Sequence, residues 1–314
     1  GVGISHTPWP RKLVTDINLA NVAGFYRIGD YSAVSASLRF FSLGEVFLSD
    51  MEDMTINPYE FAIDAGYSRM LSERFSMAVN MRFIFSDIRY DYTAESSAGK
   101  AFAADIAMYR LGYFMMGSRE CSFAWGLNIN NIGSKISYGG DDNAEFIPTN
   151  LRLGLNMTVP FNEYNKFSVA VDANKLLVPT YPKQDTENGE TDNDYTDRVQ
   201  KDYYDVSPIA GIFKSFYDAP NGFKEEMQEI QWSVGCEYTY NDRFMLRGGY
   251  HHEAANKGNR KYFTVGAGFH MSVFTVDASY VFSTSQTNPL DQTMRFSLGF
   301  DLDGMRDLFG KRRR

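Results

Sequence analysis

The sequence has little of what marks three common classes of protein. Its 314 residues include only two cysteines, Cys121 and Cys236, which form neither a disulfide framework nor a metal-binding spacing. No segment approaches the run of about 18 apolar residues that a membrane-spanning helix needs, so helical spans are excluded. A formal net charge of −8 leaves no basic surface for a nucleic acid, and we expect no nucleic acid among the partners.

Residues that carry catalysis or hold metals are also scarce. There are four histidines, and no pair of them shares metal spacing with a third ligand. No serine lies in a nucleophile-elbow motif. Two clusters, Asp141–Asn143 and Asp192–Asp194, could offer oxygen ligands to Ca²⁺, but neither matches an EF-hand loop, and both are simply explained as solvated loop tips. We therefore expect no enzyme activity, no metal and no cofactor.

Aromatic residues, by contrast, are abundant and periodically placed. Three runs near the C-terminus, 263–271, 274–283 and 294–302, alternate apolar residues with Gly, Ser, Thr and isolated charges. Alternation with a period of two indicates a β-strand with one apolar and one polar face. Each run is about ten residues long, which is the length that a tilted strand needs to cross a bilayer. The runs therefore predict membrane-spanning strands.

The same alternation recurs along the whole chain and predicts fourteen strands. They cover residues 1–9, 17–28, 31–41, 59–68, 75–86, 101–116, 123–129, 151–159, 167–172, 230–238, 244–251, 263–271, 274–283 and 294–302. Phase shifts suggest a bulge between Leu19 and Val22 and another near Tyr109. Connections after the even-numbered strands are short, and those after the odd-numbered strands are mostly longer.

This alternation of turn lengths is typical of outer-membrane barrels, which have short periplasmic turns and longer extracellular loops. The fold class we expect is all-β: a transmembrane outer-membrane β-barrel of about 14 antiparallel strands over residues 1–303, with both termini periplasmic. Residues 176–224 form one long extracellular loop, and residues 304–314 a periplasmic tail. Because Gly1 already lies in a strand and no signal peptide opens the chain, we expect that an N-terminal part precedes it.

The apolar face of each strand is expected to meet lipid. Phe, Met, Leu and Trp from fourteen strands would overfill a single interior, whereas the other face would make an odd solvent surface of small residues and isolated charges. Reversing the faces removes both objections and leaves a polar lumen in which charges pair. The charges predicted to point inward are Arg39, Asp64, Arg82, Arg152, Asp172, Glu237, Arg247, Asp277, Arg295 and Asp301.

The long loop contains the best candidate binding surface. Its acidic part, residues 182–205, holds eight acids against three bases, and so −5 of the formal charge of −8. A short helix is predicted to follow, because Ser207-Pro208 is a fair helix start and apolar residues recur at helical spacing. This apolar cluster is either a lid over the barrel mouth or a partner-binding surface. The candidate residues are Ile209, Ile212, Phe213 and Phe216, with Phe47 and Leu48 of the loop after strand 3 as a second choice.

Two stretches resemble a known family. They are residues 1–45, GVGISHTPWPRKLVTDINLANVAGFYRIGDYSAVSASLRFFSLGE, and residues 207–269, SPIAGIFKSFYDAPNGFKEEMQEIQWSVGCEYTYNDRFMLRGGYHHEAANKGNRKYFTVGAGF. They resemble the PorV (LptO) outer-membrane proteins of the Bacteroidetes type IX secretion system. The likeness runs to the last strand and leaves out the acidic segment 182–205. The family is similar to FadL-type transporters, which have fourteen strands.

The resemblance implies a non-enzymatic shuttle for secreted proteins. Such a shuttle receives cargo with a C-terminal signal domain from the translocon pore protein, of the Sov or SprA type. It passes the cargo to the attachment complex, in which the sortase PorU, with PorQ and PorZ, removes the signal and joins the cargo to lipopolysaccharide at the outer-membrane surface. The family's N-terminal segment, which could plug the lumen, would precede Gly1. No short functional motif carries over to single residues.

Two other functions fit the same barrel. A FadL-like transporter of hydrophobic small molecules would need an apolar pocket that leads through a wall opening, and the predicted inward charges speak against a wide apolar lumen. A water-filled diffusion pore would need an open lumen, and a fourteen-stranded barrel lies between packed eight-stranded barrels and open porins. The family likeness, and not the lumen chemistry, favours the shuttle.

Overall fold

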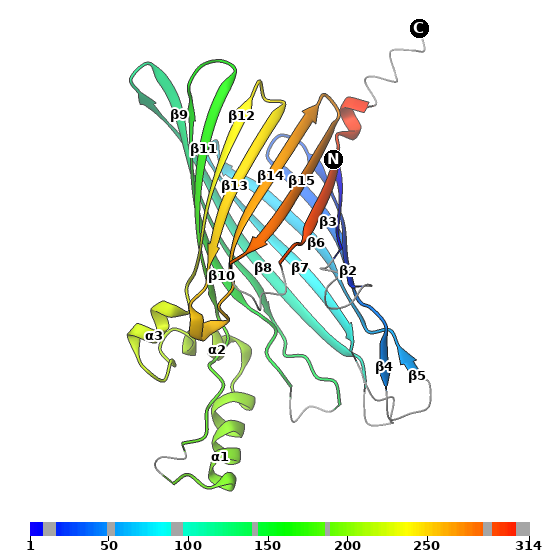
Figure 1. The fold of residues 1–314 in the computed structure, drawn as a ribbon, viewed down its shortest axis with the longest axis vertical. Helices are drawn as coiled ribbons and strands as arrows, with labels where there is room; N and C mark the ends of the chain where they lie inside the picture. The colour runs from blue at the N-terminus through cyan, green and yellow to red at the C-terminus, as the bar shows by residue number, and fades with distance from the viewer. Residues whose placement is uncertain are drawn as a thin grey trace.

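A computed structural model describes residues 1–8, 17–48, 54–88, 97–139, 144–185, 189–284 and 291–305. Within these residues, fourteen strands close into one antiparallel barrel, in which β1 pairs with both β2 and β16 (Figure 1). The predicted antiparallel β-barrel is thereby confirmed, strand number included. No helix among the described residues is both long and apolar enough to cross a membrane.

Most strands follow the alternating runs closely. The barrel strands are β1 (Val2–Pro8), β2 (Ile17–Ile28), β3 (Ser32–Leu43), β6 (Tyr59–Ser72), β7 (Phe75–Asp87), β8 (Gly99–Met116), β9 (Arg119–Gly133), β10 (Asn150–Pro160), β11 (Asn165–Leu176), β12 (Gln231–Tyr240), β13 (Phe244–His252), β14 (Lys261–Met271), β15 (Phe274–Ser283) and β16 (Met294–Phe300). The smaller elements are the hairpin β4 (Val46–Leu48) and β5 (Met54–Ile56), the helices α1 (Asp192–Val199), α2 (Pro208–Lys214) and α3 (Phe223–Gln228), and the short turns η1 (Gln200–Tyr204) and η2 (Ala255–Lys257).

The apolar faces of the strands point outward. The exposed large apolar side chains include at least one from each of the fourteen barrel strands: Ile4, Val22, Leu38, Ile63, Met81, Phe102, Phe123, Leu155, Val169, Val234, Leu246, Val265, Val276 and Leu298. On the other face, Arg82 of β7 reaches Asn131 beyond β8, and Arg247 of β13 reaches Asp277 beyond β14. Side chains meet across an intervening strand on the concave side of a curved sheet. The charged face is therefore the lumen.

Neither predicted bulge lies where the sequence phase placed it. The pairing of β2 with β1 and β3 runs without a break, so the predicted bulge between Leu19 and Val22 is wrong. The apolar phase shifts there because Leu19 and Phe25 lie on the lumen face of a regular strand. A true irregularity lies between Ala104 and Ile106, nearer the N-terminal end of β8 than Tyr109.

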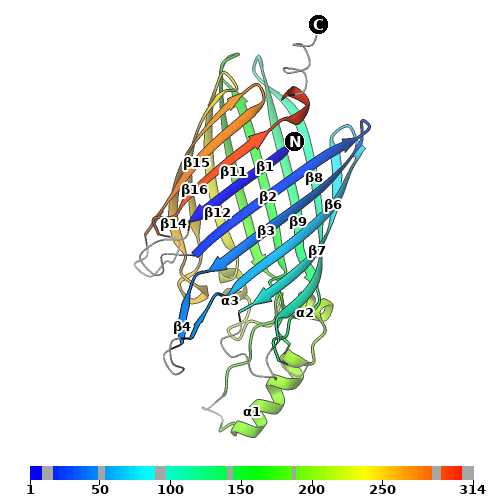
Figure 2. The same ribbon diagram turned by 90° about the vertical axis from the view of Figure 1, so that its right-hand side faces the viewer.

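The two ends of the barrel differ in character. Tight turns join β2 to β3, β6 to β7, β8 to β9, β10 to β11, β12 to β13 and β14 to β15. These turns lie at the end where β1 begins and β16 ends, which we call the terminus end (Figure 2). The helices α1, α2 and α3 and the hairpin β4–β5 lie at the opposite end, which we call the loop end (Figures 1 and 2).

Candidate functional site

A buried ion network ties three strands together on the lumen side. Arg82 Nε lies 2.6 Å from Asp64 Oδ1, and its Nη2 lies 2.9 Å from Asp105 Oδ2. Ser37 donates to Asp64 Oδ2 at 2.8 Å, and Asp105 Oδ1 accepts the Asn131 N–H at 2.8 Å. The last bond explains the irregular β8–β9 pairing, since Asn131 has a φ of 57°. Asp64 and Arg82 therefore have the paired lumen role that alternation predicts, and Asp105 joins them although alternation did not predict it.

A second network is more open to water, and some inward charges have no ionic partner. Arg247 bridges Glu237 and Asp277. Arg152 donates to Asn174 Oδ1 at 2.7 Å and forms no ion pair within the described residues. For Arg39 and Arg295 the described part of the chain likewise contains no ion pair, so the expectation that every inward charge is paired is wrong for these arginines.

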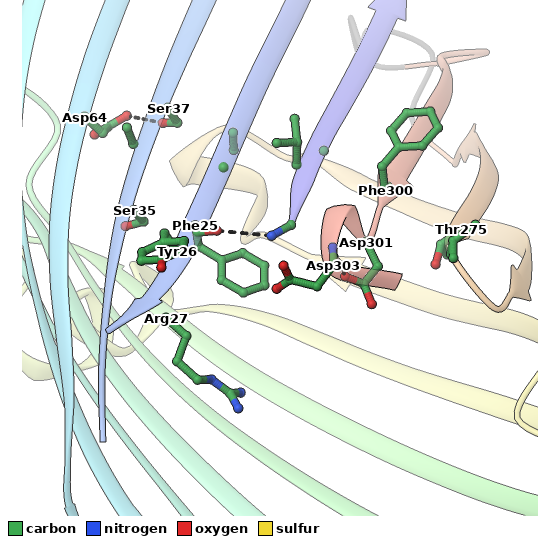
Figure 3. Close-up of a pocket in the computed structure, with 18 of the residues that line it drawn as sticks. Phe25, Tyr26, Arg27, Ser35, Ser37, Asp64, Thr275, Phe300, Asp301 and Asp303 are labelled. Atoms are coloured by element: carbon green, nitrogen blue, oxygen red, sulfur yellow. Dashed lines mark hydrogen bonds between the residues drawn. The ribbon is translucent and has the colours of Figure 1, made fainter. Parts of the chain in front are cut away.

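A cavity of about 920 Å³ opens into the lumen at the terminus end (Figure 3). Figure 3 shows the Phe25 ring extending from β2 toward Asp303, with Asp301 and Phe300 beyond it, while the Arg27 side chain extends away from these carboxylates. The lining mixes aromatic rings with charges of both signs, and within it His270 Nδ1 lies 2.8 Å from Thr275 Oγ1 and Ser37 donates to Asp64 Oδ2 at 2.8 Å. Across the described ranges, no three His, Cys, Asp or Glu side chains are grouped to hold a metal ion. The cavity therefore offers mixed apolar, ionic and hydrogen-bonding contacts.

At the loop end, the acidic segment is fixed to the connection between β9 and β10. Lys135 Nζ donates to the carbonyls of Tyr203 and Tyr204 at 3.2 and 2.6 Å and lies 4.1 Å from the centre of the Phe146 ring. Both tyrosine hydroxyls donate to Glu145, at 3.0 and 3.1 Å. Burial, a hydrogen bond with a neighbouring tyrosine and the Glu145 charge raise the pKa of Tyr204 to about 12. This anchor orders a segment in which the sequence suggested only solvated acids.

A second anchor joins α3 to the barrel rim. Lys175 Nζ lies 2.9 Å from Glu226 Oε2 and 2.5 Å from Glu229 Oε2. Lys257, in the β13–β14 connection, lies 2.7 Å from Glu225 Oε1 and 2.9 Å from Glu229 Oε1. We call these five residues, Lys175, Glu225, Glu226, Glu229 and Lys257, the rim clamp. Lys175, Glu226 and Glu229 are largely buried, so water screens their charges little.

The β13–β14 connection is itself built to hold Lys257 in place. Glu253 is fully buried and accepts hydrogen bonds from Arg260 Nε and Nη2, at 2.8 and 2.7 Å, and from the Arg260 backbone N–H at 3.1 Å. Gly258 has a φ of 125°, and a Cβ at this position would lie 2.4 Å from Glu253 Oε2. Only glycine therefore lets this loop close around the buried carboxylate.

The predicted helix forms where the sequence placed it, and it brings most of the candidate residues together. Ser207 caps α2 by accepting the Ala210 N–H at 3.3 Å. Gly211 is buried against Phe146 and Pro179, which leaves no room for a Cβ. On the free side, Ile209 is 64% exposed and Phe213 is 66% exposed, one helical turn apart. Phe216 is also exposed, whereas Ile212 is half-buried.

The second-choice residues lie elsewhere on the loop end. Phe47 and Leu48 belong to β4, where they pair with Thr55 and Met54 of β5. Figures 1 and 2 draw this hairpin apart from α2, which carries the first-choice residues. The two candidate regions therefore belong to separate elements of the loop end.

Sequence reasoning missed three features of this end. The helix α1 begins with Thr191 accepting the Asp194 N–H at 3.3 Å, and this Thr-x-x-Asp spacing is a helix-start signal that could have predicted it. The exposed residues Tyr217 and Phe223 follow α2 and begin α3. No local pattern marks the rim clamp, because its lysines and glutamates come from three separate segments.

Known proteins match this chain in two ways: a family model matches its first 183 residues, and solved structures resemble its fold over most of its length. Residues 1–183 match the family model described as PorV, type IX secretion system protein PorV. No curated protein matches the sequence. Solved structures with a similar barrel include CdiB from Acinetobacter baumannii, with 11% identity and a TM-score of 0.46 over 95% of this chain. The chain spans 59% of the length of CdiB.

Two further solved structures are similar in fold. The Ralstonia pickettii toluene transporter TbuX has 12% identity and a TM-score of 0.38, over 95% of this chain and 87% of its own. A Pseudomonas aeruginosa FadL homologue has 10% identity and a TM-score of 0.38, over 96% of this chain and 89% of its own.

Proposed function

Because the chain belongs to the PorV family of type IX secretion system proteins, we propose that it is the outer-membrane shuttle of such a system. It binds cargo with a C-terminal signal domain as the translocon pore protein, of the Sov or SprA type, releases it. It then delivers the cargo to the sortase PorU, with PorQ and PorZ, for attachment to lipopolysaccharide. The family match over residues 1–183 carries this proposal.

In this proposal the loop end is extracellular and the terminus end periplasmic. The support is the distribution of connections: six tight turns share the terminus end, and the long connections with α1, α2 and α3 share the other. Outer-membrane barrels have short turns on the periplasmic side and longer loops outside. A shuttle that hands cargo to a cell-surface complex needs its contact surface on that outer side.

We assign the partner contact to the free side of α2. Ile209 and Phe213 expose large apolar side chains, while the buried Gly211 packs the helix against Phe146 and Pro179 and Lys214 donates to the Asp202 carbonyl at 2.8 Å. In protein–protein interfaces, a few residues contribute most of the binding free energy, and aromatic side chains are common among them. Holding them in a rigid element reduces the entropy lost on binding. Phe216 extends this surface toward the rim clamp, since its ring centre lies 5.9 Å from Lys175 Nζ. Phe47 and Leu48 of β4 remain a second contact candidate.

The proposed shuttle acts by binding and not by catalysis. The paired lumen groups Arg82, Asp64 and Asp105 bond to one another, and the loop-end groups bond within the two anchors. A FadL-like transporter of hydrophobic molecules is the alternative on the same barrel, and the experiment below separates the two.

The test is co-purification from detergent-solubilised outer membrane of cells that carry the tagged protein. The intact protein is expected to recover a large barrel protein and proteins with C-terminal signal domains. The double variant Ile209→Ser/Phe213→Ser is expected to lose most of this recovery. Tyr31→Ser is the matched control, because Tyr31 is 64% exposed in a turn at the terminus end. Recovery of lipid alone by the intact protein would overturn the proposal in favour of a transporter.

A further inference from the structure

The helix α3 attaches to the outside of the barrel wall. Its Glu226 and Glu229 bind Lys175, which pairs with Leu151 in the outward row of β10 and β11. In the same row of β11, Val169 and Val171 precede Lys175, and Val169 is among the exposed apolar residues of the lipid-facing wall. Figure 1 accordingly shows α3 beside the barrel rim, outside its outline. The helix therefore lies at the loop-end edge of the lipid-facing wall.

The neighbouring outward residues mark the boundary of the membrane at this level. Trp232 of β12 pairs with His252 of β13, which pairs in turn with Lys261 of β14. With Lys175 these residues form a band of basic and aromatic side chains on the outer wall. Two residues further into the wall, Val234 is exposed and apolar. Tryptophan and basic residues gather at the headgroup level of membrane proteins, so α3 lies at that level.

The free side of α3 is apolar. Phe223 is 79% exposed and Met227 is exposed one turn later on the same face, while Glu225 on the opposite side and the buried Glu226 bind the lysines of the rim clamp. Lys224 is exposed beside Phe223. The rim clamp fixes α3 with these apolar side chains exposed. In water, that exposure would cost roughly 25 cal/mol of free energy per Å² of apolar area. Contact with lipid removes that cost.

We propose that α3 is a membrane-surface anchor, in which Phe223 and Met227 enter the boundary between headgroups and acyl chains of the leaflet at the loop end. Lys224 faces the phosphate groups of that leaflet. The arrangement is that of an amphipathic segment lying in the interface plane, here fixed to the barrel by Lys175 and Lys257. It continues the lipid-facing wall by one helical turn and fixes the height of the loop end above the membrane.

The test uses the full chain in phosphatidylcholine nanodiscs, with a nitroxide label at Phe223→Cys in a Cys121→Ala/Cys236→Ala background. Accessibility of the label to oxygen, which partitions into lipid, is compared with its accessibility to a water-soluble nickel complex. Phe263→Cys on the lipid-facing wall and Asp194→Cys on α1 give the two reference values. The label at residue 223 is expected to lie between them, with a clear loss of nickel accessibility relative to residue 194.

A label at residue 223 that is as open to nickel as one at residue 194 would overturn the proposal and leave this face for a protein partner. A second variant separates anchoring from local misfolding. Adding Lys175→Met to the labelled chain breaks the rim clamp and is expected to raise nickel accessibility at residue 223 while leaving residue 263 unchanged. No change at residue 223 in that variant would contradict the role of the clamp. Neither result depends on a secretion partner, so the proposed function is tested separately.

Discussion

Among single residues, Arg82 has the most demanding environment. Its side chain is 10% exposed, between Asp64 at 7% and Asp105 at 9%. Opposite charges at these distances stabilise one another in a poorly solvated site, and removing one of them leaves the others without a partner. Alternation placed all but one of these groups correctly, because Asp64 and Arg82 stand in regular polar positions. It missed Asp105, which lies beside the pairing irregularity.

Replacing Arg82 by Met is expected to lower the free energy of unfolding by about 3–5 kcal/mol, because two buried carboxylates then face each other without a cation. The measurement is a urea titration in detergent micelles. The control is Arg39→Met, which removes an inward arginine that has no ion pair within the described residues, and it should cost less than about 1 kcal/mol. Equal effects of the two substitutions would contradict the network's stabilising role.

Among the elements, strands and helices differ in how far the sequence predicts them. The strands β12 and β14 follow their alternating runs to within a residue or two, since one face meets lipid along the whole strand. The hairpin β4–β5 lies in a stretch expected to be a plain loop, because three-residue strands carry too little pattern. The fixed position of α3 depends on ion pairs between distant segments, and local sequence holds no information about such pairs.

The attachment of α3 to the barrel rim is expected to weaken as the pH falls. A hydrogen bond from Lys257, together with the Asn221 N–H, lowers the pKa of Glu225 from 4.5 to about 2. A carboxyl with a lowered pKa stabilises the folded state above its unfolded pKa, and this contribution is lost as pH falls through the folded value. A nitroxide at Met227→Cys should therefore be immobile near neutral pH and gain mobility between about pH 4.5 and 2.

Glu225→Gln provides the matched comparison for this pH dependence. Its label at residue 227 should be more mobile at neutral pH and should change less on acidification, since the charge that titrates is gone. A label that stays immobile in the intact chain until the barrel itself unfolds would show that the rim clamp does not hold α3.

For the molecule as a whole, the direction of the faces decides the architecture. Leu155 and Asn156 are neighbours on β10, and they point to opposite sides of the wall. The pattern of the whole chain predicted this division and the strand number, because the solvent on each side of the barrel selects residue types at every second position. The orientation of the loop end and the identity of its partner have no comparable periodic signal.

The two neighbours give a direct comparison of the faces. Leu155→Arg places a charge on the lipid side and is expected to cost about 2–4 kcal/mol of unfolding free energy in phospholipid vesicles. Asn156→Arg adds the same side chain on the lumen side and should cost much less. A larger cost for Asn156→Arg would mean that the faces are assigned the wrong way round.

We propose above all that the free side of α2 contacts secretion partners at the cell surface. Site-specific photo-crosslinking in cells tests it most directly, with a photoreactive phenylalanine analogue at residue 213 and the same analogue at residue 31 as the control. If α2 makes this contact, residue 213 is expected to crosslink to the translocon pore protein or to proteins with C-terminal signal domains. Residue 31 is expected to crosslink to none of these. Crosslinks from residue 213 to lipid alone, or to the same proteins equally from residue 31, would contradict it.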